Sequence, residues 1–444
     1  MQQNYKRLGD YIRLVDVRNK NLDVQTLLGV SIQKKLMPSI ANTVGTDMSN
    51  YKIIQRNQFA YGTVTSRNGD KISIALLKEF EKAIVSQIYL VFEIKDTAEL
   101  LPDYLMMWFR RPEFDRYARY KSHGSARETF DWNEMIETEL PIPSIEKQKE
   151  LVAEYQTIEN RMRLNNELCQ KLEETAQTVY RHWFEDFEFP VIARGEAQQN
   201  DEAISTNHIL QVAESTAEYQ NRSELVAERS RSYKSSGGEM VYSEELGREI
   251  PKGWKVETIK EISKEIITGK TPPTHDSENY GSFMPFLTIP DMHNKIFVYE
   301  YSKWISKKGV STQKNKTLPK NAICVSCIGT PGLVVIADEK LHTNQQINNI
   351  ILKDELSLYY FFFALRGLSK TIIDFGMGAA VLNNLNKDEF SKLPVLVPSK
   401  EISQRFNMEM IPIFDKIKIS LKQNIKLEEL KNLLLGKMAV EEKN

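Results

Sequence analysis

The chain repeats itself at long range, and this duplication constrains its fold more than any local pattern does. Residues 140–148 read Leu-Pro-Ile-Pro-Ser-Ile-Glu-Lys-Gln, and residues 393–404 repeat the phrase with small insertions. Residues 171–174 recur at 426–429, an offset of 255 (426 minus 171). Because long-period self-similarity marks a duplicated structural unit, we expect two halves, each a mixed globular region of about 140 residues followed by a helical segment.

Both helical segments carry apolar residues at alternating steps of four and three, the spacing of a coiled-coil seam. Polar residues stand at the same two central steps of both seams, Asn165 with Ser420 and Cys169 with Asn424. Neither helix can bury such a stripe alone, so we expect the two to pack antiparallel about a pseudo-twofold axis. The alternative is a generic core helix. The positions predicted to pair are Ile158, Met162, Leu172, Val179, Ile413, Ile417, Leu427 and Leu434.

The two long helices begin with the same sequence pattern. Ser144 and Ser399 follow prolines and precede Glu146 and Glu401, so a hydroxyl can cap the first free N–H groups while a carboxylate faces the positive end of the helix dipole. In the second helix we expect Pro412 to mark a start or a kink.

These patterns predict an α+β protein, with two mixed α/β domains separated by two long antiparallel coiled-coil helices in a pseudo-twofold tandem repeat. Residues 193–232 are rich in Glu, Gln, Ser, Asn and Ala, which predicts a flexible or partly helical linker. The expected divisions are 1–143 for the first mixed domain, 144–189 for the central long helix, 190–240 for the linker, 241–398 for the second mixed domain and 399–444 for the C-terminal long helix.

Composition excludes several classes of protein. The 59 basic and 60 acidic residues give a net charge of −1, so the chain lacks the strong positive field of a histone-like binder. Local patches are nevertheless basic, since residues 303–320 hold six lysines and no carboxylate. The alternative reading of such a patch is a solvated face. No apolar run approaches the roughly 18 residues of a membrane span, and we expect a cytoplasmic protein because no secretory signal or disulfide framework is present.

No catalytic constellation emerges from the motifs. A phosphate-binding loop ending at 269–271 would need glycine where Lys264 stands. Asp291 with residues 338–340 has a nuclease-like pattern that could hold magnesium, but 338–340 has the context of a turn between strands. The Cys-x-x-Cys at 324–327 lacks the second ligand pair of a zinc site, and the histidines form no ligand spacing. We therefore expect no catalytic residue and no metal site.

Five short phrases of the chain carry a family resemblance, together with the two Leu-Pro junctions and their helices. The phrases are found at 233–238, 249–254, 267–272, 328–332 and 344–346. Taken together, they resemble the specificity subunit of a type I restriction-modification system. The resemblance covers nearly the whole chain except about 193–232, and the first domain departs from it by lacking Gly-Lys-Thr-Pro and Gly-Thr-Pro-Gly phrases.

The resemblance implies a DNA reader without catalytic activity. In that family two target-recognition domains each read one half of a split, asymmetric DNA site, and paired helices set the gap between them and dock two methyltransferase subunits. Adenine N6 methylation with S-adenosylmethionine, and ATP-driven cleavage by motor-nuclease subunits, belong to the partners. S-adenosylmethionine, ATP and magnesium are therefore expected in partner subunits and no cofactor in this chain.

The helix length agrees with this geometry. Residues 158–184 would span roughly 40 Å at about 1.5 Å per residue, and one turn of duplex DNA is about 34 Å. Two alternatives remain open: a nuclease or methyltransferase complete in one chain, and a coiled-coil scaffold without DNA function. The residues predicted to contact double-stranded DNA, from local charge near loops, are Arg67, Lys121, Arg127, Lys270, Lys307, Lys308, Lys314 and Lys316.

Overall fold

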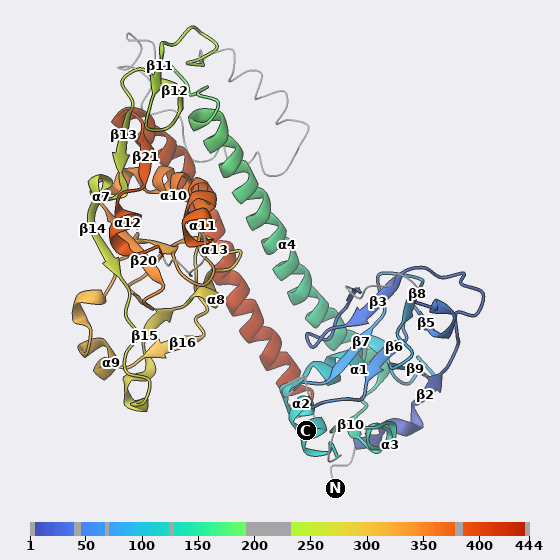
Figure 1. The fold of residues 1–444 in the computed structure, drawn as a ribbon. Coiled ribbons are helices and arrows are strands. Elements are labelled where there is room, and N and C mark those ends of the chain that lie inside the picture. The colour runs from blue at the N-terminus through green and yellow to red at the C-terminus, as the bar shows by residue number, and fades with distance from the viewer. Residues whose placement is uncertain are drawn as a thin grey trace. The chain divides into compact units, whose positions relative to one another are not determined.

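A computed structural model describes the chain over residues 5–39, 46–66, 71–123, 128–191, 232–377 and 385–439. It divides into two compact units. The first unit holds Met1–Leu164 and Gln423–Asn444, and the second unit holds Asn165–Lys422. The boundary falls within two long helices, α4 (Ile145–Phe184) and α13 (Lys400–Lys437), so that each unit contains a part of both (Figure 1).

The first unit combines short strands with three short helices and the start of α4. Its described elements are β1 (Tyr5–Arg7), η1 (Leu8–Asp10), β2 (Ile12–Val15), β3 (Leu27–Val30), β4 (Leu36–Pro38), η2 (Met48–Asn50), β5 (Lys52–Gln55), β6 (Phe59–Gly62), β7 (Ser73–Leu76), β8 (Lys82–Val85), β9 (Leu90–Ile94), α1 (Pro102–Arg110), α2 (Pro112–Tyr120), α3 (Trp132–Ile136) and β10 (Glu139–Pro141).

The second unit has the same kind of composition. Its described elements are β11 (Met240–Ser243), β12 (Arg248–Pro251), β13 (Lys255–Thr258), α7 (Ile259–Ile262), β14 (Ser263–Thr268), η3 (Ser277–Asn279), β15 (Tyr280–Leu287), α8 (Ile289–Met292), β16 (Lys303–Ile305), α9 (Lys307–Ser311), η4 (Lys314–Lys316), β17 (Ile323–Ser326), β18 (Val334–Ile336), β19 (His342–Thr343), β20 (Ile347–Leu352), η5 (Glu355–Ser357), α10 (Leu358–Gly367), α11 (Ser369–Met377), α12 (Lys387–Ser391) and β21 (Pro394–Val397).

The two units share one topology. The first contains a four-stranded sheet of order β2-β9-β6-β7, and the second a four-stranded sheet of order β14-β20-β17-β18, in which every strand occupies the equivalent place. Each unit also has a second sheet, and the central pairings of these two sheets match. In the first unit β3 pairs antiparallel with β4 and parallel with β8. In the second unit β15 pairs antiparallel with β16 and parallel with β19. The predicted duplication of a mixed domain is therefore confirmed.

Individual residues also match between the units. Asn57 and Asn321 both adopt a positive φ, of 68° and 69°, and each lies two residues before the first residue of its strand, β6 or β17. Asparagine tolerates this left-handed conformation better than other residues with a side chain do. Tyr104 donates a hydrogen bond to the carbonyl of Pro141, and Tyr360 donates one to the carbonyl of Leu396. The repeat thus extends to the hydrogen bonds that hold α1 and α10 in place.

The repeated Leu-Pro phrase has a structural purpose in both copies. It forms β10, which pairs antiparallel with β1, and β21, which pairs antiparallel with β13. The chain then enters the long helix at Ser144 and Ser399, whose Oγ atoms accept hydrogen bonds from the Lys147 and Ile402 amides at 3.3 and 3.5 Å. With this cap at Ser399, α13 begins at Lys400. Pro412 lies inside α13, so the expectation that it marks the start of the helix is wrong.

The long helices pack against each other within each unit. In the second unit, the Trp183 and Phe406 rings lie 5.7 Å apart, and Cys169 Sγ lies 3.9 Å from the Ile417 carbonyl oxygen. Residue numbers therefore rise along α4 as they fall along α13, which makes the pair antiparallel. In the first unit the Arg161 guanidinium donates to Gln423 Oε1 at 3.4 Å. The prediction of paired antiparallel helices is confirmed.

Candidate nucleic-acid interface

Two of the phrases noted in the sequence meet at one end of the sheet that contains β14 and β20. The Lys270 amide donates to the Thr343 carbonyl at 3.0 Å, and Thr271 Oγ1 donates to Gln345 Oε1 at 2.5 Å. Glycine is required at position 269, because a Cβ there would lie 2.3 Å from Thr343 Oγ1. This close approach places exposed Lys270 beside exposed Gln345.

The loop between β17 and β18 brings in a third phrase. Gly329 and Gly332 have φ of 81° and 91°, a region that glycine enters without steric cost. A Cβ on Gly329 would lie 3.2 Å from Gln346 Nε2, and Gln346 Oε1 accepts a hydrogen bond from Asn344 Nδ2 at 2.9 Å. We call Asn344, Gln345 and Gln346 the amide rim. Because amide side chains can bond base edges bidentately, the rim has chemistry suited to base readout.

Three of the predicted lysines form what we call the lysine patch: Lys307, Lys314 and Lys316. Lys307 is the first residue of α9, and the other two lie at the ends of η4. Lys307 and Lys314 are exposed and Lys316 is half-buried. Within the described part of the chain, no ion pair neutralises these three ammonium groups. Their charge is therefore available to an anionic partner.

Lys308 differs from its neighbours. Its Nζ lies 2.9 Å from Asp276 Oδ2 and 2.6 Å from Glu278 Oε2. Hydrogen bonds from Lys308 to Glu278 and Asp276 raise the pKa of its ammonium. Its charge is already compensated, so Lys308 is better suited to hold α9 against η3 than to bind a phosphate.

A buried histidine positions the turn η4. The His342 ring is fully buried, with Nδ1 3.1 Å from Gln313 Nε2 and Nε2 2.8 Å from Thr317 Oγ1. Burial lowers the pKa of His342 to about 4, so the ring is neutral near pH 7. Because both nitrogens are bonded to residues that flank η4, His342 fixes the backbone that carries Lys314 and Lys316. Sequence reasoning missed this role, since no spacing pattern links the three residues.

In the first unit the predicted contacts are less complete. Lys121 Nζ lies 3.7 Å from Glu134 Oε2, a long ion pair that leaves its side chain 40% exposed. Arg67 and Arg127 lie outside the described residues. Tyr120, directly before Lys121, is 82% exposed. The C-terminal end of α2 therefore carries an exposed aromatic ring, and the next residue carries an exposed ammonium group.

The predicted helix-pairing residues lie in two apolar clusters. In the first unit, Ile158 and Met162 of α4 pack in one cluster with Leu427 and Leu434 of α13. The second unit places the remaining four in one cluster, Leu172 and Val179 of α4 with Ile413 and Ile417 of α13. The polar seam residues Asn165 and Ser420 are also buried, at 3% and 1% exposure.

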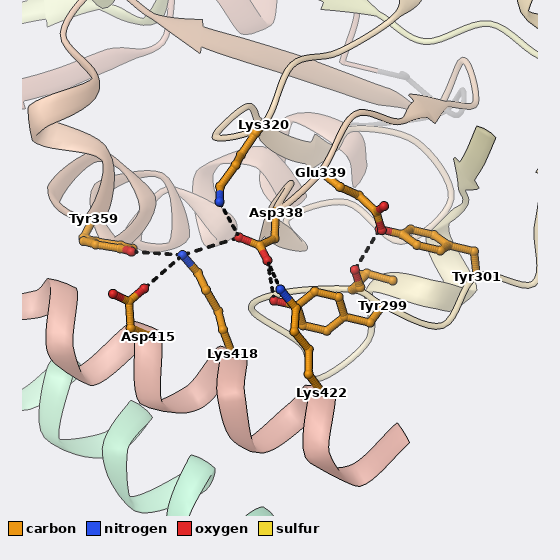
Figure 2. Close-up of polar contacts among 10 residues, drawn as sticks. Tyr299, Tyr301, Lys320, Asp338, Glu339, Tyr359, Asp415, Lys418 and Lys422 are labelled. Carbon is orange, nitrogen blue, oxygen red and sulfur yellow. Dashed lines mark hydrogen bonds and ion pairs between the residues drawn. The ribbon is translucent and has the colours of Figure 1, made fainter. Parts of the chain in front are cut away.

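An ionic cluster fastens α13 to the sheet of the second unit (Figure 2). Asp338, in the turn after β18, accepts hydrogen bonds from Lys422 Nζ at 2.8 Å and from the Tyr299 hydroxyl at 2.7 Å. Lys320 and Lys418 lie 3.3 and 3.5 Å from its other oxygen. Burial alone would raise the pKa of Asp338, but the hydrogen bonds and lysine charges outweigh it and lower that pKa to about 2.

Replacing Asp338 by asparagine should destabilise the second unit by about 2 kcal/mol at neutral pH, because a depressed carboxyl pKa is linked to folding stability. The folded-state pKa lies below the unfolded value, so this stabilisation is present above pH about 4 and disappears as the pH falls through about 2. Urea unfolding of wild type and Asp338→Asn across this pH range measures the difference.

The matched control is Asp415→Asn, since Asp415 contacts the same Lys418 at 3.5 Å but its side chain is 55% exposed. This change should alter stability by less than about 1 kcal/mol. An Asp338→Asn deficit that equals the control, or that stays constant down to low pH, would show that the cluster does not fasten the helix.

The other motifs have structural explanations. Asp291 accepts hydrogen bonds from the amide and hydroxyl of Thr288, closing a capping box at the start of α8. Cys324 and Cys327 are buried, at 0% and 2% exposure. In the described ranges no group of three or more His, Cys, Asp or Glu residues is placed to hold a metal ion. Among the described residues, no helix is both long enough and apolar enough to span a membrane.

Comparison with known proteins identifies the family. A family model described as type I restriction modification DNA specificity domain matches residues 251–432. The chain is 31% identical over 404 residues to the HindI specificity subunit of Haemophilus influenzae, covering 87% of this chain and 86% of the relative. It is 23% identical over 347 residues to the MjaIX specificity subunit of Methanocaldococcus jannaschii, covering 76% and 68% respectively.

A solved structure adds the fold. The type I restriction-modification S subunit from M. genitalium matches with a TM-score of 0.53 at 12% identity, over 98% of this chain and 95% of that one. Its fold is thus shared by the present chain, with two mixed domains and long helices. The chain therefore belongs to the family of type I restriction-modification specificity subunits, which are non-catalytic DNA-recognition subunits.

Proposed function

We propose that this chain reads a split, asymmetric sequence in double-stranded DNA, with one half of the sequence assigned to each unit. The observation that carries the proposal is that two units of one topology have different loops. The Gly-Lys-Thr-Pro loop and the amide rim of the second unit have no counterpart phrase in the first. Equivalent frameworks with unlike loops suit two half-sites of unlike sequence.

The second unit offers both kinds of contact that sequence-specific binding needs. Its amide rim supplies donors and acceptors for base edges, while Lys270 and the lysine patch supply positive charge for phosphates. In the first unit, Lys121 is the corresponding candidate among the described residues. Arg67 and Arg127 stay predictions.

The helices are the proposed docking surface for two methyltransferase subunits. In the second unit α13 exposes Met408, Ile411 and Ile419, at 63%, 42% and 52%. In the first unit it exposes Leu430 and Leu433, at 51% and 65%. Apolar side chains exposed on a helix whose other face is packed are typical of a surface that binds a partner.

The partners supply the chemistry in this proposal. The methyltransferase subunits would bind S-adenosylmethionine and transfer its methyl group to adenine, and motor-nuclease subunits would use ATP and magnesium to cleave. This chain contributes recognition and spacing, and it requires no cofactor of its own.

Genome-wide mapping of methyladenine tests the proposal. Co-expression of this chain with its methyltransferase subunit should produce methylation at one split motif, and deletion of the chain should abolish it. The control is the methyltransferase subunit expressed alone. A methylome that is the same with and without this chain would contradict the proposed function.

A further inference from the structure

We propose that Phe283 acts as a wedge that stacks on DNA bases when the second unit binds its half-site, with the adjacent lysines contacting the flanking phosphates. This inference rests on the proposed function and adds a stacking contact to it. It starts from an aromatic side chain that is 50% exposed on β15, a strand whose following residues Pro285, Phe286 and Leu287 are buried.

The strand pairing pushes this ring outward. Tyr280 and Met284 both pair with Ile305 of β16, so the three residues between them have no partner in the described β15–β16 register. Such a bulge bends the strand and redirects side chains. Gly281, Ser282 and Phe283 are all exposed as a result. The Phe283 ring is therefore carried by a bulge that projects from the paired part of the sheet.

The bulge is held on a rigid base. Ser306 donates its amide hydrogen to the Asn279 carbonyl at 2.9 Å and its hydroxyl hydrogen to the Glu278 carbonyl at 2.5 Å. A Cβ on Gly309 would lie 2.2 Å from the Asn279 oxygen, so only glycine allows α9 to approach η3 this closely. The Tyr280 hydroxyl also donates to the Pro272 carbonyl at 3.1 Å. A ring presented on so fixed a base loses little freedom on binding.

The charge around the ring favours DNA as the occupant. Lys307 Nζ lies 5.3 Å from the centroid of the Phe283 ring. The nearby acids Asp276 and Glu278 are both paired with Lys308, which leaves the charge of Lys307 uncompensated among the described residues. An exposed lysine–aromatic contact is weak, so a phosphate can draw the ammonium away and leave the ring free to stack. Proteins that bend DNA commonly insert an apolar side chain between base steps.

The test uses the whole complex and a duplex that carries the mapped site. 2-Aminopurine is substituted at successive positions in the half-site assigned to the second unit, and its fluorescence reports unstacking. Methyltransferases flip their target base out of the duplex, so the adenine to be methylated is left out of the series. At the remaining positions, the wild-type complex should increase the fluorescence at one step. Phe283→Ala should abolish the increase and weaken binding about 5- to 150-fold, the range for losing one stacked base. The slope of log K against log salt should stay unchanged, because this variant retains every lysine that faces a phosphate.

Two variants sharpen the result. Phe283→Trp should restore the fluorescence increase, because it keeps an aromatic face. Tyr242→Ala removes an aromatic ring that is 66% exposed on β11 of the same unit, and it should behave as wild type.

The outcomes separate this inference from the proposed function. Failure of the wild-type complex to bind the mapped duplex contradicts both. Away from the adenine to be methylated, two results overturn the wedge and leave the proposed function standing: normal binding without unstacking at any position, and unstacking that survives in Phe283→Ala. If Phe283→Ala instead loses its methyltransferase subunits on a sizing column, the surface belongs to a protein partner and the wedge is wrong.

Discussion

Ile417→Asp should unfold the second unit, because it would place an unpaired carboxylate in a packed interface and lower the free energy of unfolding by at least about 3 kcal/mol. Ile417 is 2% exposed and lies in the cluster where Leu172 and Val179 of α4 meet α13. The change also gives up the burial of an isoleucine, worth about 1.5–3 kcal/mol. Thermal and urea unfolding of the purified chain measure the effect.

The matched control lies two residues away on the same helix. Ile419 is 52% exposed, so Ile419→Asp should change stability by less than about 0.5 kcal/mol. If both variants unfolded at the same temperature as wild type, the packing of the long helices would not stabilise the second unit. If both were equally destabilised, the effect would reflect charge on α13 and not burial at position 417.

Removing the lysines around α9 and η4 should weaken DNA binding and flatten its dependence on salt. The variant replaces four residues by alanine: Lys307, Lys308, Lys314 and Lys316. Every phosphate that the variant no longer neutralises should reduce the slope of log K against log salt by about 0.9, which gives roughly 2.7 if the lysine patch binds three phosphates. Lys308 should contribute little to the slope, because Asp276 and Glu278 already compensate its charge. Titration of the mapped duplex at several salt concentrations measures the binding constant and its dependence on salt.

The control variant makes the same change in net charge elsewhere in the second unit. It replaces four other exposed lysines by alanine: Lys252, Lys255, Lys260 and Lys264. Its slope should remain near that of wild type. If the first variant kept the wild-type slope, the lysine patch would not belong to the DNA interface. If both variants flattened the slope by the same amount, the effect would come from net charge in general.

The duplicated architecture could be predicted because its determinants are local and occur twice. The Leu-Pro phrase must form the strand before a capped helix in both copies, and the seam spacing requires a packing partner. Asn57 and Asn321 illustrate how far the correspondence goes, since both hold a left-handed turn before equivalent strands.

The site was harder to predict, since its features depend on residues distant in sequence. Residues 303–320 contain no carboxylate, yet Lys308 is neutralised by acids about thirty positions earlier, across a fold that composition cannot reveal. Asp338 meets Lys422 across 84 positions for the same reason. The exposure of Phe283 follows from a shift in strand register, which no single-strand pattern encodes.

The first unit combines two separate segments of the chain, Met1–Leu164 and Gln423–Asn444. Leu434, Leu435 and Met438 belong to the same core as Leu151 and Ile158, whereas the second unit is continuous from Asn165 to Lys422. During synthesis on the ribosome, the first unit begins to emerge before the second. Its core nevertheless becomes complete only after the second unit has been made, because Leu434, Leu435 and Met438 are translated last. A premature stop codon after the codon for Lys422 would leave all residues of the second unit in place, but it would remove Leu434, Leu435 and Met438 from the core of the first unit.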